Sequence, residues 1–247
     1  MFYSNGVNQR AINILILVLV VLSFASMSSG DWLYLLLTLP PVIIAITFHE
    51  FAHAYAADRL GDTTPRNQGR LSLNPISHLD LMGFILMMFA HIGWGKPVQI
   101  NPSNFNSNKS RAFCETMVSL AGPLMNFFLA LVSCVAYVIL SLAGSSSLLN
   151  SNVGIAIMYL LSMLITVNIG LGVFNLIPLP PLDGEKIFRH ILPYRAKEWL
   201  DRNYQTLTMA FMILWFFGFL EILVSPIIST LRYGLVYGVE FIVSLFI

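Results

Sequence analysis

Charged residues are scarce in this chain of 247 residues, since Asp, Glu, Lys and Arg together make up 10% of it. Soluble domains carry roughly 25% charged and about 45–50% apolar residues. This chain is instead 57% hydrophobic and has a mean hydropathy of +0.76. These values exclude a soluble enzyme and a disordered chain, and they predict a single integral membrane domain over residues 1–247.

An excess of either charge is also missing, because 13 basic residues face 12 acidic ones and leave a net charge of +1. Such a chain has no global attraction for a phosphate backbone, so we expect no nucleic-acid partner. Cysteine is equally sparse. Cys114 and Cys134 lie in apolar sequence and form neither a disulfide framework nor a C-x-x-C metal site. We interpret both as small hydrophobic residues.

Long charge-free runs are the main feature that is present, and a membrane-spanning helix needs about 20 mostly apolar residues. They predict an all-α polytopic protein with six spans, at approximately 11–30, 32–57, 115–142, 153–177, 206–224 and 227–247. Residues 81–95 are apolar but too short to span comfortably, which predicts a re-entrant or interfacial hairpin.

The basic residues predict the orientation of these spans. With the N-terminus in the cytosol, all of them except Arg232 lie on the cytosolic side, and most fall in the two loops at 59–111 and 186–202. By the positive-inside rule, both loops are therefore cytosolic. The alternative is that residues 1–30 are a cleaved signal peptide, since Arg10 precedes an apolar stretch. Within the first loop, short alternating patterns at 69–74 and 97–101 predict brief strands at the membrane surface.

One motif in the second predicted span points to chemistry. His49, Glu50 and His53 form the pattern H-E-x-x-H, which on a helix places two imidazoles on one face with a carboxylate beside them. Zinc binds such ligands in a tetrahedral site that leaves one position open for water. An ionisable side chain at mid-membrane costs about 2.5–3.5 kcal/mol, so a plain pair of core histidines is the weaker interpretation. We expect His49 and His53 to bind zinc and Glu50 to act as the general base.

A third protein ligand is still required, and Asp183 is the best candidate. It ends the charge-free run 116–182 at the cytosolic end of the fourth span, where Pro178, Pro180 and Pro181 prevent a regular helix. Asn175, eight residues earlier, is a candidate for stabilising an oxyanion or holding the substrate backbone. Interhelical hydrogen bonding is an equally good reading of Asn175.

Several other polar residues receive a plainer interpretation. Asn126 and Asn168 are expected to make hydrogen bonds between membrane helices. His78 and Asp80 form a possible second ligand pair, but they follow a strand-like run that fixes no geometry, so we expect hydrogen bonding instead. His91 and His190 receive no function.

Taken together, these motifs resemble the site-2 protease family of intramembrane zinc metalloproteases, in particular its compact bacterial members. The resemblance rests on H-E-x-x-H at 49–53, on N-x-x-P…L-D-G at 175–184, on G-R-L-S-L-N-P at 69–75 and on Gly122-Pro123 with Asn126. It implies zinc bound by His49, His53 and Asp183, catalysis by Glu50 and a supporting role for Asn175. It also implies a three-helix catalytic core, and we expect no PDZ-like insertion.

The resemblance further implies hydrolysis of peptide bonds in or near the transmembrane segments of single-span substrates. The expected location is the lipid bilayer of a bacterial inner membrane, with the active site near the cytosolic face. Two alternatives use the same ligands. A zinc transporter or metal sensor would need a polar path across several spans, and the charge-free runs offer none. A noncatalytic binder of membrane helices would have no need of Glu50.

Overall fold

A computed structural model describes residues 28–81, 83–85, 95–106 and 109–246, and within these ranges every regular element is helical. The long helices are α2 (Ser29–Arg59), α5 (Arg111–Ala143), α7 (Asn152–Asn175), α9 (Tyr194–Phe216) and α10 (Phe219–Val243). Short helices lie between them, namely α3 (Thr64–Asn67), α6 (Ser146–Leu149), α8 (Asp183–Arg189) and the 3-10 turns Pro75–Ser77 and Pro102–Asn104. The predicted all-α class is confirmed for the described residues.

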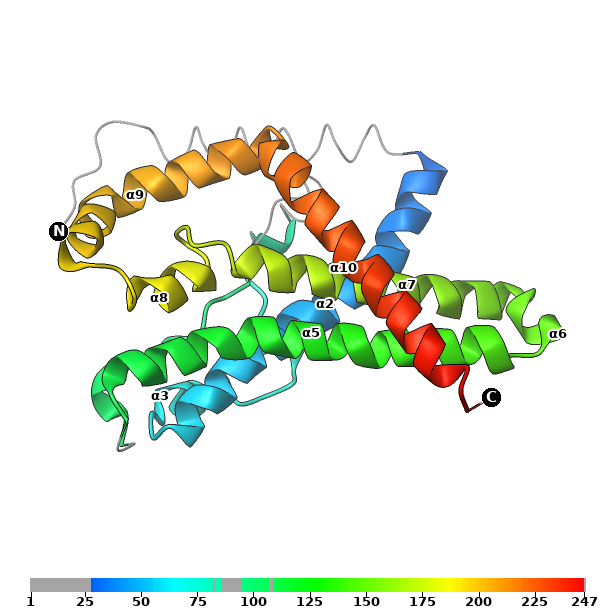
Figure 1. The fold of residues 1–247 in the computed structure, drawn as a ribbon, viewed down its shortest axis with the longest axis horizontal. Coiled ribbons are helices and arrows are strands. Elements are labelled where there is room, and N and C mark those ends of the chain that lie inside the picture. The colour runs from blue at the N-terminus through cyan, green and yellow to red at the C-terminus, as the bar shows by residue number, and fades with distance from the viewer. Residues whose placement is uncertain (1–27, 82, 86–94, 107–108, 247) are drawn as a thin grey trace.

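Helices α2, α5 and α7 pack against one another and form the core of the molecule. Figure 1 shows α5 and α7 lying side by side, with α2 crossing behind them. Glycine allows this close approach: a Cβ on Gly172 of α7 would lie 2.9 Å from the ring of Phe127 on α5. The predicted three-helix core is therefore present in the arrangement of these elements.

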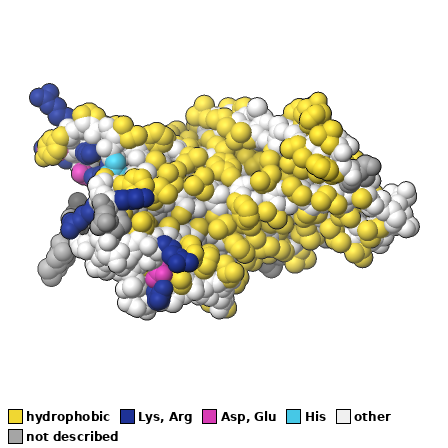
Figure 2. Space-filling model, turned by 60° about the horizontal axis from the view of Figure 1, so that its bottom comes forward, with side chains coloured by type: hydrophobic (Ala, Val, Ile, Leu, Met, Phe, Trp, Pro, Cys, Tyr) yellow, Lys and Arg dark blue, Asp and Glu magenta, His cyan; other side chains and the backbone are white. Residues whose placement is uncertain are grey.

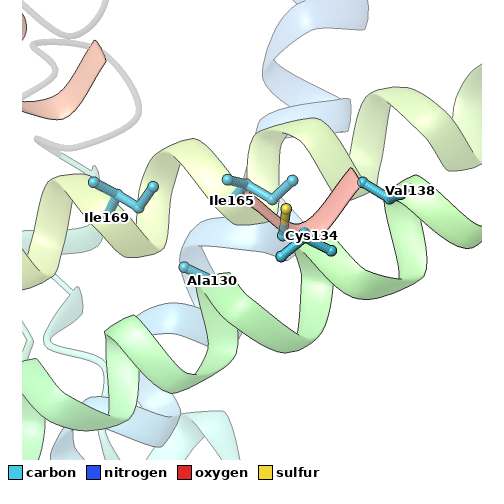
Figure 3. Packing of buried hydrophobic residues seen from close by; sticks show 6 residues of the cluster. Ala130, Cys134, Val138, Ile165 and Ile169 are labelled. Atoms are coloured by element: carbon cyan, nitrogen blue, oxygen red, sulfur yellow. The ribbon is translucent and has the colours of Figure 1, made fainter. Parts of the chain in front are cut away.

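Among the described residues, the larger of two buried apolar clusters joins this core to α10. Ala130, Cys134 and Val138 follow one another at intervals of four residues on α5 and meet Ile165 and Ile169 of α7 (Figure 3). This spacing puts the α5 side chains on one face of the helix. Val239 of α10 completes the cluster. Cys134 is thus a small core residue, as expected.

Four helices of the described chain are long and apolar enough to cross a membrane, at Leu36–Arg59, Arg111–Ala143, Asn152–Asn175 and Phe219–Val243. Figure 2 shows hydrophobic side chains over most of one face and charged side chains gathered at one end. A multi-pass integral membrane protein is the class that such a surface and such helices define. The predicted first span at 11–30 lies almost wholly outside the described residues.

The structure corrects the predicted boundaries of the last two spans. The sequence predicts that one span ends and the next begins near residue 225. In the structure the chain turns at Gly218 instead, whose φ of 74° is readily adopted by glycine. As a result α10 covers parts of both predicted segments. Helix α9 begins at Tyr194, well before the predicted span, with a first half that carries several charges, and it is not among the helices apolar enough to span.

The predicted strands at 69–74 and 97–101 are also wrong. These residues form turns and irregular segments, and the described part of the loop contains one isolated bridge, between Leu79 and Gly95. Side-chain hydrogen bonds hold these segments in place, instead of the backbone hydrogen bonds of a sheet. The alternation of residue types therefore does not predict their structure. The predicted hairpin at 81–95 lies mostly outside the described residues.

Candidate metal centre and active site

Helix α2 presents His49 and His53 to the interior of the bundle. The two residues are separated by one helical turn, and their Nε2 atoms lie 3.0 Å apart. Both side chains are buried, with relative exposures of 6% and 7%. The predicted placement of both imidazoles on one helix face is therefore what the structure has.

The other nitrogen of each ring has a hydrogen-bond acceptor. His53 Nδ1 lies 2.7 Å from the carbonyl oxygen of Val118, which can only accept, so Nδ1 carries the hydrogen and donates. His49 Nδ1 donates in the same way to Asn126 Oδ1 at 2.7 Å. Both Nε2 atoms are then unprotonated in the neutral ring and offer a lone pair, which is the arrangement typical of metal-binding histidines.

The orientation of the Asn126 amide is itself fixed by its neighbours. Its Nδ2 donates to the carbonyl of Ala45 at 3.2 Å and to Asn168 Oδ1 at 2.9 Å, which leaves Oδ1 to face His49. Asn168 in turn donates to the carbonyl of Leu164 at 2.9 Å. The expected interhelical hydrogen bonding is confirmed for both asparagines. The sequence did not reveal that this chain of bonds ends on a histidine of the candidate metal centre.

Asp183 lies beside both imidazoles although it is 130 residues from His53 in the sequence. Its Oδ2 lies 3.2 Å from His49 Nε2 and 3.1 Å from His53 Nε2, and the residue is 8% exposed. It begins α8, where Gly184 permits a tight approach because a Cβ there would lie 2.3 Å from the carbonyl oxygen of Ile177. The three predicted ligands are therefore brought together from segments 130 residues apart.

This donor set fits a divalent cation. Two lone pairs and a carboxylate oxygen would repel one another at 3.0–3.2 Å unless a positive charge lay between them. A tetrahedral zinc site with bonds of about 2.0–2.2 Å has ligand–ligand distances of roughly 3.3–3.5 Å. The observed spacing is only slightly tighter than this.

Gly122 of α5 leaves the space that the site needs. A Cβ at this position would lie 2.3 Å from His53 Nε2 and 2.7 Å from His49 Nε2. Any larger residue would therefore enter the centre itself. The sequence marked Gly122 only as part of a resemblance, and no local pattern reveals that its α-carbon faces the histidines.

Glu50 lies beside this group and is half-buried. Its Oε2 accepts a hydrogen bond from the backbone N–H of Val98 at 3.2 Å. Gly95 passes close to the same carboxylate, since its Cβ would lie 3.4 Å from Oε1. The segment that begins at Gly95 thus contacts the predicted general base directly.

The remaining candidates have other partners. Asn175 Nδ2 donates to the carbonyl of Leu171 in its own helix at 3.0 Å, so its predicted catalytic role stays a prediction. His78 is fully buried and donates through Nε2 to the carbonyl of Ser72 at 2.6 Å. Asp80 accepts from the N–H of Gly83 at 2.8 Å. His78 and Asp80 thus make the hydrogen bonds expected of them.

The fold and the centre define a multi-pass membrane protein with a group that could hold a metal ion. Comparison with known proteins identifies this class as the metalloproteases. The family model "Peptidase family M50" matches residues 144–219, which include Asp183. A protein of Bacillus subtilis (strain 168) named as a zinc metalloprotease, YwhC, is 41% identical over 166 residues, which cover 66% of this chain and 72% of YwhC.

A second relative is the Mycobacterium tuberculosis protein named as the zinc metalloprotease Rip2. It is 30% identical over 146 residues, and the match spans 58% of this chain but only 52% of Rip2. No solved structure gives a significant match. On the strength of these similarities, the chain belongs to peptidase family M50, the site-2 protease family of metalloproteases.

Proposed function

We propose that this protein is an intramembrane zinc metalloprotease that hydrolyses peptide bonds in or near transmembrane segments of membrane proteins. The observation that carries the proposal is the convergence of two imidazole lone pairs and one carboxylate within 3.2 Å, beside a further carboxylate. His49, His53 and Asp183 would hold zinc, one ion per chain. The metal, when bound, supplies a Lewis acid that polarises a carbonyl and makes water more acidic.

The chain's own groups account for the proton movements of this reaction. Glu50 is adjacent in sequence to His49 and follows it by about 100° around the helix, which puts its carboxylate beside the ligands. It would accept the proton of the attacking water and later deliver it to the leaving amine. Asn175, at the end of α7, would hold substrate backbone or an oxyanion if its amide turns away from Leu171.

The substrates that suit this centre are single-span membrane proteins. Amides within a transmembrane helix are bonded internally, so the segment to be cut must first unwind. Segment 97–101 forms no strand by itself, but it lies next to Glu50, and its backbone would form hydrogen bonds with the unwound substrate. We expect Gln99→Pro and Ile100→Pro to impair cleavage, and full activity in both variants would contradict this pairing.

The proposed location is a bacterial inner membrane, with the N-terminus and the loops around α3 and α8 in the cytosol. At 1.5 Å per residue from Trp32, His49 lies about 26 Å along an apolar core of about 30 Å, near its cytosolic face. Arg66 and Arg70 lie near one end of α2, and Lys186 and Arg189 lie in α8, which contacts α5. This distribution supports the orientation by the positive-inside rule.

Reconstitution tests the function. The purified chain is placed in liposomes with a panel of single-span substrates, and wild type is compared with Glu50→Gln. We expect cleavage by wild type, retained zinc in Glu50→Gln and a loss of cleavage of at least about 100-fold in that variant. Cleavage by Glu50→Gln at the wild-type rate would refute the assigned base. Zinc flux without any cleavage would instead support a transporter.

A further inference from the structure

The carboxylate of Glu50 is oriented by a segment that comes from outside its own helix. The N–H of Val98, which lies outside α2, donates to Oε2 of Glu50 at 3.2 Å. A hydrogen bond to one oxygen restricts rotation of the carboxylate and leaves Oε1 to exchange the proton. The position of Glu50 during the reaction therefore depends on how firmly the segment around Val98 is held.

Arg70 holds this segment on one side of Val98. Its side chain is buried, and the guanidinium donates to three backbone carbonyls, those of Ser77, Lys96 (3.2 Å) and Pro97 (3.4 Å). A guanidinium has five N–H donors in a rigid plane, so one side chain can join all three. The N–H of Lys96 adds a bond of 2.7 Å to the carbonyl of His78.

Asp62 holds the segment on the other side. The residue is fully buried, and its Oδ2 accepts from the N–H of Asn101 at 2.6 Å. Its Oδ1 accepts from the N–H of Thr64 and from the amide of Asn104, both at 3.0 Å. Asp62 lies in the turn just after α2, which ends at Arg59, so the helix that carries Glu50 is also tied to the far end of the segment.

We infer that Arg70 and Asp62 are positioning residues that clamp segment 95–101 against α2 so that the Val98 N–H is directed at Glu50. The hydrogen-bond partners of both side chains lie in the loop, and none of these partners is a candidate metal ligand. Both are buried, and a buried charge costs several kcal/mol unless it is fully hydrogen-bonded, so their bonds to backbone account for their burial. The inference rests on the proposed function for its catalytic consequence, but the clamp itself can be tested without activity.

Three variants test the clamp in the full-length protein in detergent. Arg70→Gln removes the charge and most of the donors, Arg70→Lys restores the charge with a single ammonium, and Val98→Pro deletes the N–H. Arg66→Gln is the matched control, because Arg66 lies in the same loop, pairs with Asp58 and has a side chain that is 63% exposed. Val98→Ala keeps the N–H and measures what the side chain alone contributes.

We expect Arg70→Gln and Val98→Pro each to lower kcat about 10–100-fold, with KM and zinc content unchanged, because misplacement by about 1 Å has an effect of this size. Arg70→Lys should recover part of the loss, and Arg66→Gln should match wild type. The double variant Arg70→Gln/Val98→Pro should be no slower than Val98→Pro, since both changes remove the same hydrogen bond.

Hydrogen exchange of residues 95–101 supplies a readout that does not depend on catalysis. Arg70→Gln should exchange faster there than wild type, whereas Arg66→Gln should not. Unchanged exchange overturns the clamp whether or not the protein cleaves its substrates. The clamp is also overturned if the losses of kcat in the two single variants multiply in the double variant, or if KM rises while kcat stays constant. Loss of zinc from these variants overturns it too, as does a loss of kcat in Val98→Ala equal to that in Val98→Pro. Cleavage by Glu50→Gln at the wild-type rate refutes the proposed function instead.

Discussion

Gly122 and Asn126 lie one turn apart on α5, and both face the histidines of α2. Gly122 provides the space in front of both Nε2 atoms, and Asn126 accepts the hydrogen of His49 Nδ1. The first residue contributes by lacking a side chain, and the second by orienting a ligand.

Gly122→Ala tests the space at the centre. The added methyl group would lie within 3 Å of both imidazoles, so we expect the zinc affinity to fall at least about 10-fold. Zinc bound per chain, measured by mass spectrometry of the metal after dialysis against a chelator, reports the change. Gly170→Ala is the matched control, because its Cβ would meet only Ile228 at an ordinary 3.6 Å. Equal zinc retention in both variants would contradict the predicted crowding.

Asn126→Leu tests the orientation of His49. It removes the acceptor for Nδ1 and leaves the carbonyl of Ala45 without this donor, so we expect zinc to bind about 10–100-fold more weakly. Competition with a fluorescent zinc chelator measures the affinity. Asn150→Leu, at an exposed position, serves as the control. An affinity equal to that of wild type would show that the hydrogen bond to His49 has no such effect.

The placement of individual residues could be predicted from the sequence where the geometry is local. H-E-x-x-H puts two imidazoles on one helix face by helix geometry alone, and the position of Asp183 at the end of a charge-free run made it the candidate third ligand. Gly122 and Asn126 were missed as parts of the site because their roles depend on how α5 crosses α2. Asn126 and His49 are 77 residues apart, and no spacing within α5 indicates which face meets the histidines.

At the scale of elements, the long apolar helices could be predicted and the polar loop could not. Charge-free runs give α5 and α7 within a few residues of their true ends, because a membrane core demands apolar helices of that length. The loop between α2 and α5 is instead organised by single buried groups, Asp62, Arg70 and His78. Such contacts have no period, so the alternation at 69–74 and 97–101 wrongly suggested strands.

The loop should respond to acid through Asp62. Burial raises the pKa of this carboxyl, but hydrogen bonds from Thr64, Asn101 and Asn104 lower it more, so the folded pKa lies below the ordinary value of 3.8. A depressed pKa means that the stabilisation is complete above about pH 4 and is lost as the pH falls through the folded value.

We therefore expect the amides of residues 101–104 to lose protection from hydrogen exchange only below about pH 4, after correction for the intrinsic rate. Asp62→Asn should exchange faster than wild type at neutral pH and show a smaller change on acidification. Mass spectrometry of the corresponding peptides gives both values. Equal protection of the two proteins from pH 7 to pH 3 would contradict this role of Asp62.

At the scale of the whole molecule, the charged side chains of the face drawn in Figure 2 gather at one end, and α3, α8 and the start of α5 lie at that end in Figure 1. The opposite end carries α6 between α5 and α7. The proposed orientation predicts that Ser147→Cys reacts with an impermeant thiol reagent added outside the cell and that Lys197→Cys does not. The native Cys114 and Cys134 are buried, which keeps the background low. The reverse labelling pattern would invert the topology.

Zinc bound per chain in wild type and Asp183→Ala, with X-ray absorption of the metal in each, tests the central claim that remote segments share one ion. The account predicts one zinc in wild type, coordinated by two imidazoles and oxygen, and a loss of the ion or of one oxygen ligand in Asp183→Ala. A wild-type protein without zinc, or an Asp183→Ala variant with full zinc and an unchanged spectrum, would contradict it.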